Sequence, residues 1–205
     1  MSIQLPVDID TVKGFLAASE GEALFHLASG CAALGACLEV GSYCGKSSIY
    51  LGTACRETDN ILFAVDHHRG SEEHQPGEEY HDPALFDSSA HLMDSFRTFR
   101  ANMRAAELEE CVVPVVAPSA VAARRWNTPL GLVFIDGGHS REAALTDYRC
   151  WARHIVPGGF LAIHDIFPDP ADGGQAPHEI YQLALASGQF ELVEMVDTLG
   201  ILRRL

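Results

Sequence analysis

The sequence predicts an α/β protein built around a doubly wound, Rossmann-like sheet of parallel strands. Short apolar runs alternate along the 205 residues with stretches of helical character, which is the pattern of strand–helix–strand units. The run LGLVFID at 130–136 is almost entirely apolar, as expected of a parallel strand that is covered on both faces. Two strand-like runs around a tight turn near Asp197 and Thr198 end the chain, and such a hairpin adds an antiparallel edge.

The elements follow in order from hydrophobic periodicity and turn residues. We expect strands at 36–40, 61–66, 111–116, 130–136 and 160–165, followed by the hairpin FELVEMVD and LGILRRL. We expect helices at 46–56, from 88 onward, and at 118–126, 140–155 and 178–187. Ser140 is a typical N-cap, and Pro157-Gly158-Gly159 should stop the helix that it begins.

The first 35 residues are expected to be helical. They carry apolar residues at Phe15, Leu16, Leu24, Phe25 and Leu27. These side chains could cover the sheet or a neighbouring subunit. Because they exceed what one face of a sheet this size needs, we expect a homo-oligomer.

Composition limits the kind of partner. The formal net charge is −14, which disfavours nucleic acid and other polyanions. No apolar run approaches the ~20 residues that span a bilayer, and the first residues lack the layout of a signal peptide. The six cysteines form no C-x-x-C pair, so we expect reduced thiols in a cytoplasmic protein that binds neither nucleic acid nor membrane.

The stretch LEVGSYCGKSSIYL at 38–51 resembles a phosphate-binding loop but departs from it. A P-loop needs four residues between its first glycine and Gly-Lys, whereas three stand between Gly41 and Gly45. A dinucleotide loop needs G-x-G-x-x-G, and position 43 is Tyr. Glu39 at the strand end would also repel a phosphate.

What remains is an acidic strand end followed by a tight glycine turn. Such a site suits a ligand that approaches the backbone closely and carries positive charge or hydroxyl donors. S-adenosylmethionine, with its ammonium, sulfonium and two ribose hydroxyls, fits that description. Asp66 ends the next strand, where a carboxylate reaches the ribose of a ligand at the switch point. Asp66 could instead be a solvated residue that caps the next turn.

From Leu38 to Phe167 the sequence resembles the class I S-adenosylmethionine-dependent methyltransferases. The branch is that of the small-molecule O-methyltransferases of macrocin, catechol and cephalosporin-biosynthesis type. The segments that carry the resemblance are LEVGSYCGKSS, FAVDHH, LVFIDGGHSREAALTDYRCW and VPGGFLAIHD. The resemblance implies a seven-stranded sheet with its last strand antiparallel. We expect the chain to divide into a helical N-terminal extension at 1–35 and a methyltransferase domain at 36–205. It also implies a small-molecule hydroxyl as the methyl acceptor.

The resemblance also implies a set of cofactor contacts. The methionyl end would contact Glu39, Gly41 and Ser42, the ribose would contact Asp66, and the adenine would lie near Ser119. The complete set of expected cofactor-binding residues is Glu39, Gly41, Ser42, Gly45, Ser47, Asp66, His67, Ser119 and Asp136.

Acids and imidazoles at the ends of two later strands suggest the chemistry. Asp136 and Asp165 end neighbouring strands, and parallel strands present their carboxyl ends to one crevice. With His164 they compose a divalent-metal site, and nitrogen in the shell shifts preference from Mg²⁺ towards Mn²⁺, Fe²⁺ or Zn²⁺. His139 is an alternative nitrogen ligand. Asp136 and His139 are the expected catalytic residues.

Plainer interpretations stay open for these residues. His164 could be a hydrogen-bonded core histidine, because alternate strand residues face opposite ways. Asp136 could orient the cofactor without a metal, and His139 could be a general base. The histidine-rich segment 67–87 departs from the family pattern. It could be a solvated loop or a lid over the substrate. The whole chain could also be a non-catalytic or regulatory module that binds S-adenosylmethionine.

Overall fold

The computed structural model describes residues 3–71 and 82–205. Its centre is a seven-stranded sheet with the order β5-β2-β1-β6-β7-β9-β8. The strands are β1 (Ala36–Val40), β2 (Leu62–Asp66), β5 (Val112–Val116), β6 (Leu130–Ile135), β7 (Ile155–Ile163), β8 (Phe190–Val196) and β9 (Leu199–Arg204). The first five pair in parallel, and β9 runs antiparallel to both β7 and β8. The predicted doubly wound sheet with an antiparallel last strand is confirmed.

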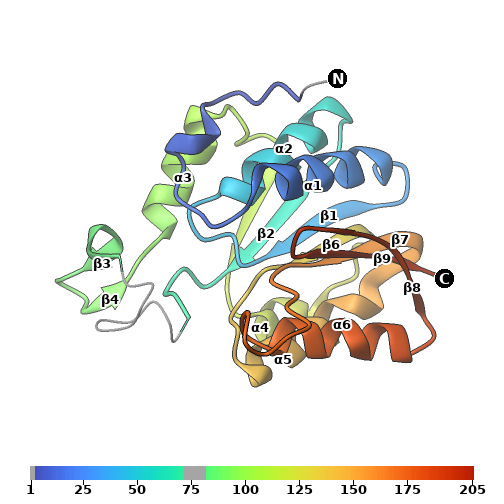
Figure 1. Cartoon of the computed structure of the whole chain (residues 1–205). Helices are drawn as coiled ribbons and strands as arrows, with labels where there is room; N and C mark the ends of the chain where they lie inside the picture. Colours follow the sequence, from blue (N-terminus) through green and yellow to red (C-terminus); the bar gives the residue numbers. More distant parts are fainter. Residues whose placement is uncertain (1–2, 72–81) are drawn as a thin grey trace.

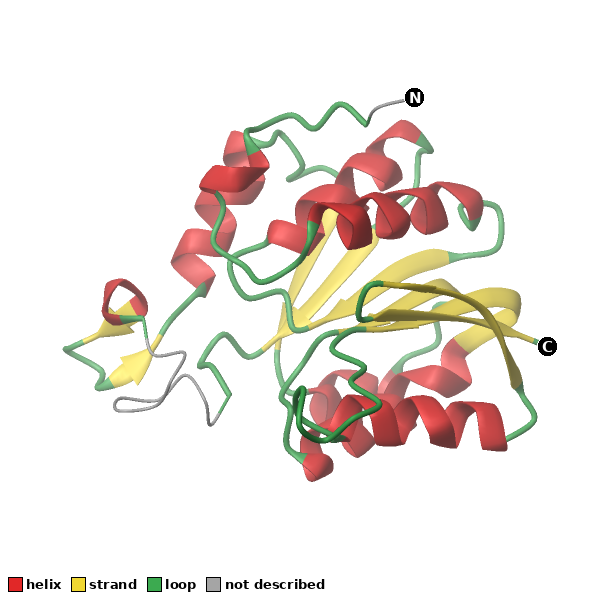
Figure 2. Cartoon of the chain, viewed as in Figure 1, coloured by secondary structure: helices red, strands yellow, loops and turns green. Residues whose placement is uncertain are grey.

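Helices cover both faces of this sheet (Figures 1 and 2). On one face lie α1 (Ala18–Gly30), α2 (Lys46–Glu57) and α3 (Phe96–Ala105). On the other lie α4 (Ser119–Ala122), α5 (Arg141–Trp151) and α6 (Ala176–Ala186). Short 3-10 turns are η1 (Ile9–Thr11), η3 (Pro83–Leu85), η4 (Ala123–Arg125) and η5 (Ala152–His154), and β3 (Phe86–Asp87) pairs with β4 (Leu92–Met93). Among the described residues, no helix is both long and apolar enough to cross a membrane.

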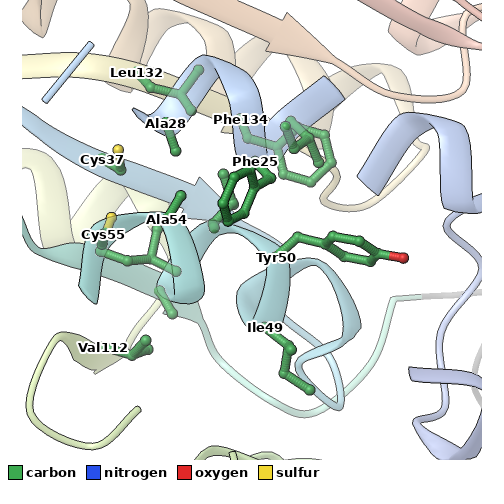
Figure 3. Close-up of a cluster of buried hydrophobic side chains, with 14 of the residues drawn as sticks. Phe25, Ala28, Cys37, Ile49, Tyr50, Ala54, Cys55, Val112, Leu132 and Phe134 are labelled. Carbon is green, nitrogen blue, oxygen red and sulfur yellow. The ribbon is translucent and has the colours of Figure 1, made fainter. Parts of the chain in front are cut away.

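Alternate strand residues feed two separate cores. Cys37 and Leu132 face the α1–α2 layer, where Phe25 and Tyr50 join them (Figure 3). Leu38, in contrast, faces the α5–α6 layer. Every residue of β6 is buried, which explains why the central strands read as continuous apolar runs rather than alternating ones.

Most of the expected apolar side chains of the N-terminal segment are covered by this chain itself, whereas Phe15 is 66% exposed. Leu16, Leu24 and Phe25 are all buried in the α1–α2 core. The expected homo-oligomer rests on apolar side chains of this segment that exceed what one face of the sheet needs. These three side chains are covered within the chain and do not support that expectation. Exposed apolar side chains gather instead on edge strand β8, at Leu192, Val193 and Met195. Self-association stays a prediction, with β8 as its better-placed surface.

The expected helical segment 1–35 is helical only in part, since α1 begins at Ala18 and the described residues before it hold only the 3-10 turn η1. Two further predicted boundaries are wrong for local reasons. The helix expected from Ser88 begins only at Phe96, because Asp94 accepts a hydrogen bond from the Phe96 amide and Leu92–Met93 forms β4. Pro157-Gly158-Gly159 do not stop a helix. Helix α5 ends at Trp151, and the three residues lie inside β7, where the pairing register with β6 shifts. Proline and glycine are typical of such a bulge. Of the polar segment 67–87, residues 72–81, with His74 and His81, lie outside the described residues.

Candidate active site

A cleft opens at the carboxyl ends of β1, β2 and β6. The sheet order reverses direction between β1 and β6, and this switch point is where doubly wound sheets bind ligands. The cleft has a volume of about 720 Å³, which lies within the range of small-molecule sites. The expected residues Gly41, Ser42, Asp66 and Ser119 line it together with Asp136.

A tight turn after β1 forms one wall. Gly41 adopts φ +90°, and a Cβ there would lie 2.0 Å from the Asp136 carbonyl oxygen, so only glycine fits. Gly45 is the N-cap of α2. The Ser42 side chain is buried against the turn, and its Oγ has no hydrogen-bond partner among the described residues. A buried hydroxyl without a partner is costly, so Ser42 is an unfavourable group at this turn.

Glu39 lies fully buried behind the turn. Its two carboxylate oxygens accept hydrogen bonds from the hydroxyls of Ser47 and Ser48 at the start of α2. Burial raises the pKa of Glu39 to about 8, and the charges of Asp136 and Asp66 contribute to this increase. The hydrogen bonds from the two serines act in the opposite direction and lower the pKa. Glu39 therefore supports the turn directly, and its expected contact with the methionyl end stays a prediction.

Asp66 ends β2 beside the turn. One carboxylate oxygen accepts the Tyr43 amide at 2.9 Å, and the other accepts the His68 amide at 2.7 Å. Each oxygen keeps a further lone pair that a hydroxyl can use. His67 is exposed at the rim of the cleft, whereas the His68 ring is buried beside Ser95.

Ser119 begins α4 on the other side of the cleft. Its Oγ accepts a hydrogen bond from the Trp151 indole at 2.9 Å. Asp147 of α5 bonds to Ser119, is 8% exposed and lines the cleft. Burial raises the pKa of this carboxyl to about 6. Sequence reasoning missed Asp147, although an acid between Ala144 and Trp151 on the inward stripe of a helix is a detectable signal.

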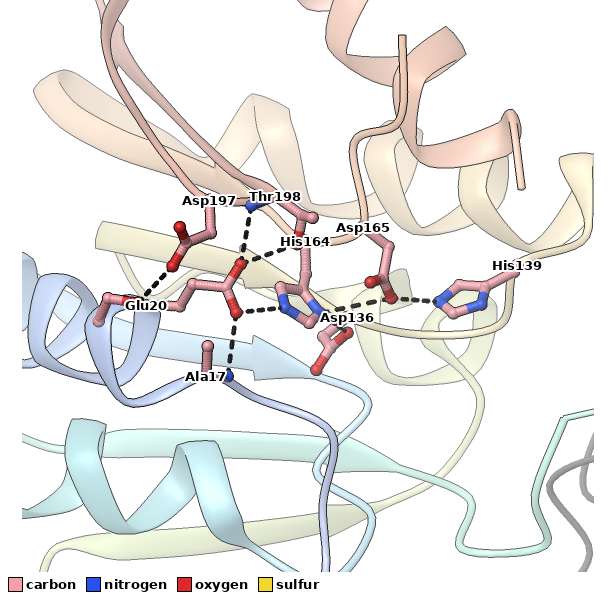
Figure 4. Close-up of polar contacts among 9 residues, drawn as sticks. Ala17, Glu20, Asp136, His139, His164, Asp165, Asp197 and Thr198 are labelled. Carbon is pink, nitrogen blue, oxygen red and sulfur yellow. Dashed lines mark hydrogen bonds and ion pairs between the residues drawn. The ribbon is translucent and has the colours of Figure 1, made fainter. Parts of the chain in front are cut away.

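The acids and imidazoles of the β6 and β7 ends meet, as Figure 4 shows. Strand β7 ends at Ile163, and Asp165 adopts φ +58°, so His164 and Asp165 both reach the crevice. His139 Nε2 lies 3.1 Å from Asp165 Oδ2. His164 Nδ1 lies 2.9 Å from Asp136 Oδ1 and 3.4 Å from Asp165 Oδ2. A non-glycine residue held in the left-handed region is a feature that clusters at functional sites.

His164 is enclosed by carboxylates. Its Nε2 lies 2.9 Å from Glu20 Oε2, and both side chains are buried. Burial alone would lower the pKa of His164, but the charge of Asp136 and hydrogen bonds to Asp136, Asp165 and Glu20 raise it to about 12. Burial opposes the ionised form of Asp165 as well, yet bonds from His139 and His164 hold its pKa well below the usual range. His164 is thus an imidazolium with both nitrogens engaged.

Among the residues that meet at this site, Glu20 is the one that the sequence indicates least. One of its oxygens accepts the Thr198 amide and hydroxyl, at 3.0 and 2.7 Å, and the other accepts the Ala17 amide at 3.1 Å. Burial would raise the pKa of Glu20, but His164 and these donors lower it. The one hint in the sequence is an acid on the buried stripe of α1, one turn before Leu24.

A second set of side chains has the composition of a cation site. Ligand atoms of Asp136, His139 and Asp165 all lie within 4.8 Å of one another. Two carboxylates and an imidazole suit a divalent ion. His164, which the sequence suggested as the nitrogen ligand, already places both ring nitrogens on carboxylates.

Known proteins are similar to this chain in sequence family and in fold. A family described as a methyltransferase domain matches residues 38–166. The solved structure of cofactor-bound Rv0187 from MTB is 17% identical, over 95% of this chain and 84% of that chain, with a TM-score of 0.68. The O-methyltransferase TomG from Streptomyces achromogenes, in complex with SAM, is 16% identical over 93% and 81%, with a TM-score of 0.64. An O-methyltransferase from Bacillus cereus in complex with SAH is 15% identical over 93% and 83%, with a TM-score of 0.63.

The matched family, together with the Rossmann-like fold, defines a methyltransferase. The chain belongs to the methyltransferase-domain family that matches residues 38–166, which confirms the resemblance to class I methyltransferases. The similar solved structures share its fold over most of their length.

Replacing Glu20 tests the enclosed imidazolium. In Glu20→Gln the buried His164 loses one of its countercharges, and breaking such a pair costs about 3 kcal/mol. We expect the urea midpoint at pH 7 to fall accordingly. Glu22→Gln, on the exposed face of the same helix, should leave it unchanged. Equal midpoints for the two variants would show that Glu20 does not stabilise the site.

Glu39 gives a pH-dependent expectation. Its pKa in the folded protein is about 8 against 4.5 for the ordinary side chain, so the folded state binds this proton more tightly. The resulting stabilisation is complete below pH 4.5 and is lost as pH rises through 8. Without ligand, Glu39→Gln should therefore melt higher than the parent at pH 8 and about equally at pH 5. A difference in melting temperature between variant and parent that is the same at both pH values would contradict the raised pKa of Glu39.

Proposed function

We propose that this methyltransferase uses S-adenosylmethionine to methylate a hydroxyl of a small molecule, with help from a divalent metal ion. The observation that carries the proposal is a single cleft that holds a glycine turn, a strand-end acid and the Asp136–His139–Asp165 group. The similar structures named above include O-methyltransferases in complex with SAM and SAH, which supports the same cofactor here.

The cleft residues fit S-adenosylmethionine. Gly41 and Ser42 line the cleft, and the missing side chain at Gly41 lets the turn pack against the Asp136 carbonyl. Asp66 has lone pairs left for two ribose hydroxyls. The residues that would hold the cofactor are Glu39, Gly41, Ser42, Gly45 and Ser47 at the methionyl end, Asp66 and His67 at the ribose, Ser119 near the adenine and Asp136 near the sulfonium.

The metal proposal rests on the donor set. Asp136, His139 and Asp165 supply two oxygens and one nitrogen, which suits Mn²⁺, Fe²⁺ or Zn²⁺ better than Mg²⁺. His164 would orient Asp136 and Asp165 rather than bind the ion, because both its nitrogens are engaged. A bound ion would lower the pKa of the acceptor hydroxyl and fix its position.

The chain's own residues would align donor and acceptor. The acceptor oxygen bonds to the methyl carbon as the carbon–sulfur bond breaks in line, which requires near-attack geometry. The hydroxyl proton leaves to a base. His139, whose ring Asp165 orients at 3.1 Å, is in place to take the proton if no metal takes part.

The alternative function is a binding or regulatory module that retains the cofactor without catalysis. A shallow, open surface over Asp136 would favour it. The observed cleft of about 720 Å³, with Asp136, His139 and Asp165 in its lining, favours the enzyme.

The ribose contact is tested by Asp66→Asn. This change keeps the shape of the side chain but removes its charge, and charge-assisted hydrogen bonds contribute about 1.5–3 kcal/mol. We expect calorimetry to show affinity for S-adenosylhomocysteine roughly tenfold to a hundredfold weaker. Asp87→Asn, at an exposed acid away from the cleft, is the matched control. Unchanged affinity in folded Asp66→Asn would place the ribose elsewhere.

The metal is tested by direct binding. Mn²⁺ titration followed by electron paramagnetic resonance should show one bound ion, which Asp165→Asn weakens at least tenfold by removing one charged ligand. Affinity for S-adenosylhomocysteine should survive both this variant and EDTA, because the expected cofactor contacts of Glu39 and Asp66 do not involve the ion. If the parent protein binds no Mn²⁺ at millimolar concentration, the metal proposal fails and His139 becomes the base.

A further inference from the structure

We infer that Asp147 accepts a hydrogen bond from the exocyclic amine of the cofactor's base, so that this carboxylate makes the cleft select adenine. The inference rests on the proposed use of S-adenosylmethionine. It assigns a specificity-determining role to a side chain that neither the glycine turn nor the metal group involves.

The first argument is the position of the carboxylate. Asp147 comes from α5 and is 8% exposed, yet it lines the cleft together with Ser119 of α4. Gly137, in the loop after β6, lies directly against it, since a Cβ on Gly137 would be 2.6 Å from Asp147 Oδ2. The absence of a side chain at 137 leaves room for the carboxylate at the cleft wall.

The second argument is its hydrogen bonding. The Trp151 indole N–H donates to Ser119 Oγ at 2.9 Å, which leaves the Ser119 hydroxyl proton to donate to Asp147. Among the described residues, this hydroxyl is the one hydrogen-bond donor to Asp147, and one hydroxyl does not satisfy a carboxylate with about four acceptor sites. A buried carboxylate that is short of donors is costly, and the pKa of Asp147, raised to about 6 by burial, reflects that cost. Donors from the cleft would relieve it.

The third argument identifies the donor. Ser119 follows β5 and Asp66 ends β2, so the order β5-β2-β1 places Ser119 beyond Asp66 as seen from the glycine turn. Asp147 reaches this side of the cleft from α5, through its hydrogen bond with Ser119. A nucleoside with its ribose on Asp66 then directs its base towards Ser119 and Asp147. Adenine presents an amine donor at N6. Hypoxanthine presents a carbonyl oxygen there, which a carboxylate repels.

The experiment is calorimetry with S-adenosylhomocysteine and with S-inosylhomocysteine, which differs in carrying the carbonyl. The parent protein should prefer the adenine compound by at least about 30-fold, since a site built around a donor rejects a ligand that lacks it. In Asp147→Asn the amide can donate to a carbonyl, so the preference should fall below about threefold. Glu142→Gln makes the same kind of change at an exposed residue of α5 that also lines the cleft, and it should keep the preference.

The outcomes separate the two proposals. Tight binding of S-adenosylhomocysteine with the same base preference in parent and folded Asp147→Asn would overturn the role of Asp147 and leave the cofactor standing. No binding of S-adenosylhomocysteine by the parent would overturn both. If Asp147→Asn does not fold, the parent protein is tested with the analogue of S-adenosylhomocysteine that carries hydrogen in place of the exocyclic amine, and its affinity is compared with that for S-adenosylhomocysteine. A loss of about tenfold or more supports the inference, and equal affinity overturns it.

Discussion

The structure depends on one buried cation held among carboxylates. The His164 ring lies between Glu20 and Asp136, and Asp165 lies 3.4 Å from its Nδ1. The ring contacts helix α1 through Glu20 and the ends of β6 and β7 through the two aspartates (Figure 4). The β8–β9 turn joins them because Thr198 donates to Glu20. Taking charges out of water is costly, and only close, complementary partners offset the cost. The same pairing fixes Asp136 and Asp165 in the cleft, so the stability of the fold and the geometry of the site share one interaction.

A second constraint is the contact between the glycine turn and the loop after β6. At Gly41 the backbone comes so close to the Asp136 carbonyl that no side chain fits between them. The turn after β1 is thereby held at a fixed distance from the loop after β6. Glu39 supports this contact from behind through Ser47 and Ser48. Burying an acid in this position is unfavourable by itself. Strained or energetically costly groups are common at functional sites.

The sheet was predictable because its information is local. The central strands read as continuous apolar runs, and the hairpin turn at Asp197 is marked by its own residues. The strand-end acids Asp66, Asp136 and Asp165 follow directly from that sheet. Glu20 and Asp147 were not predictable in this way, because each reaches the site from a helix. Glu20 meets a histidine 144 positions away. Such contacts depend on how helices pack, which a single sequence does not specify. Pro157-Gly158-Gly159 misled for a related reason, since the same residues serve a helix stop or a strand bulge.

The turn between β8 and β9 has a consequence for the order of assembly. Thr198 donates two hydrogen bonds to Glu20 across 178 positions of chain, and closing so large a loop is entropically slow compared with local pairing. Until the hairpin docks, the acid on α1 lacks those donors. The surroundings of His164 are therefore complete only when two segments far apart in the sequence, α1 and the β8–β9 hairpin, have met.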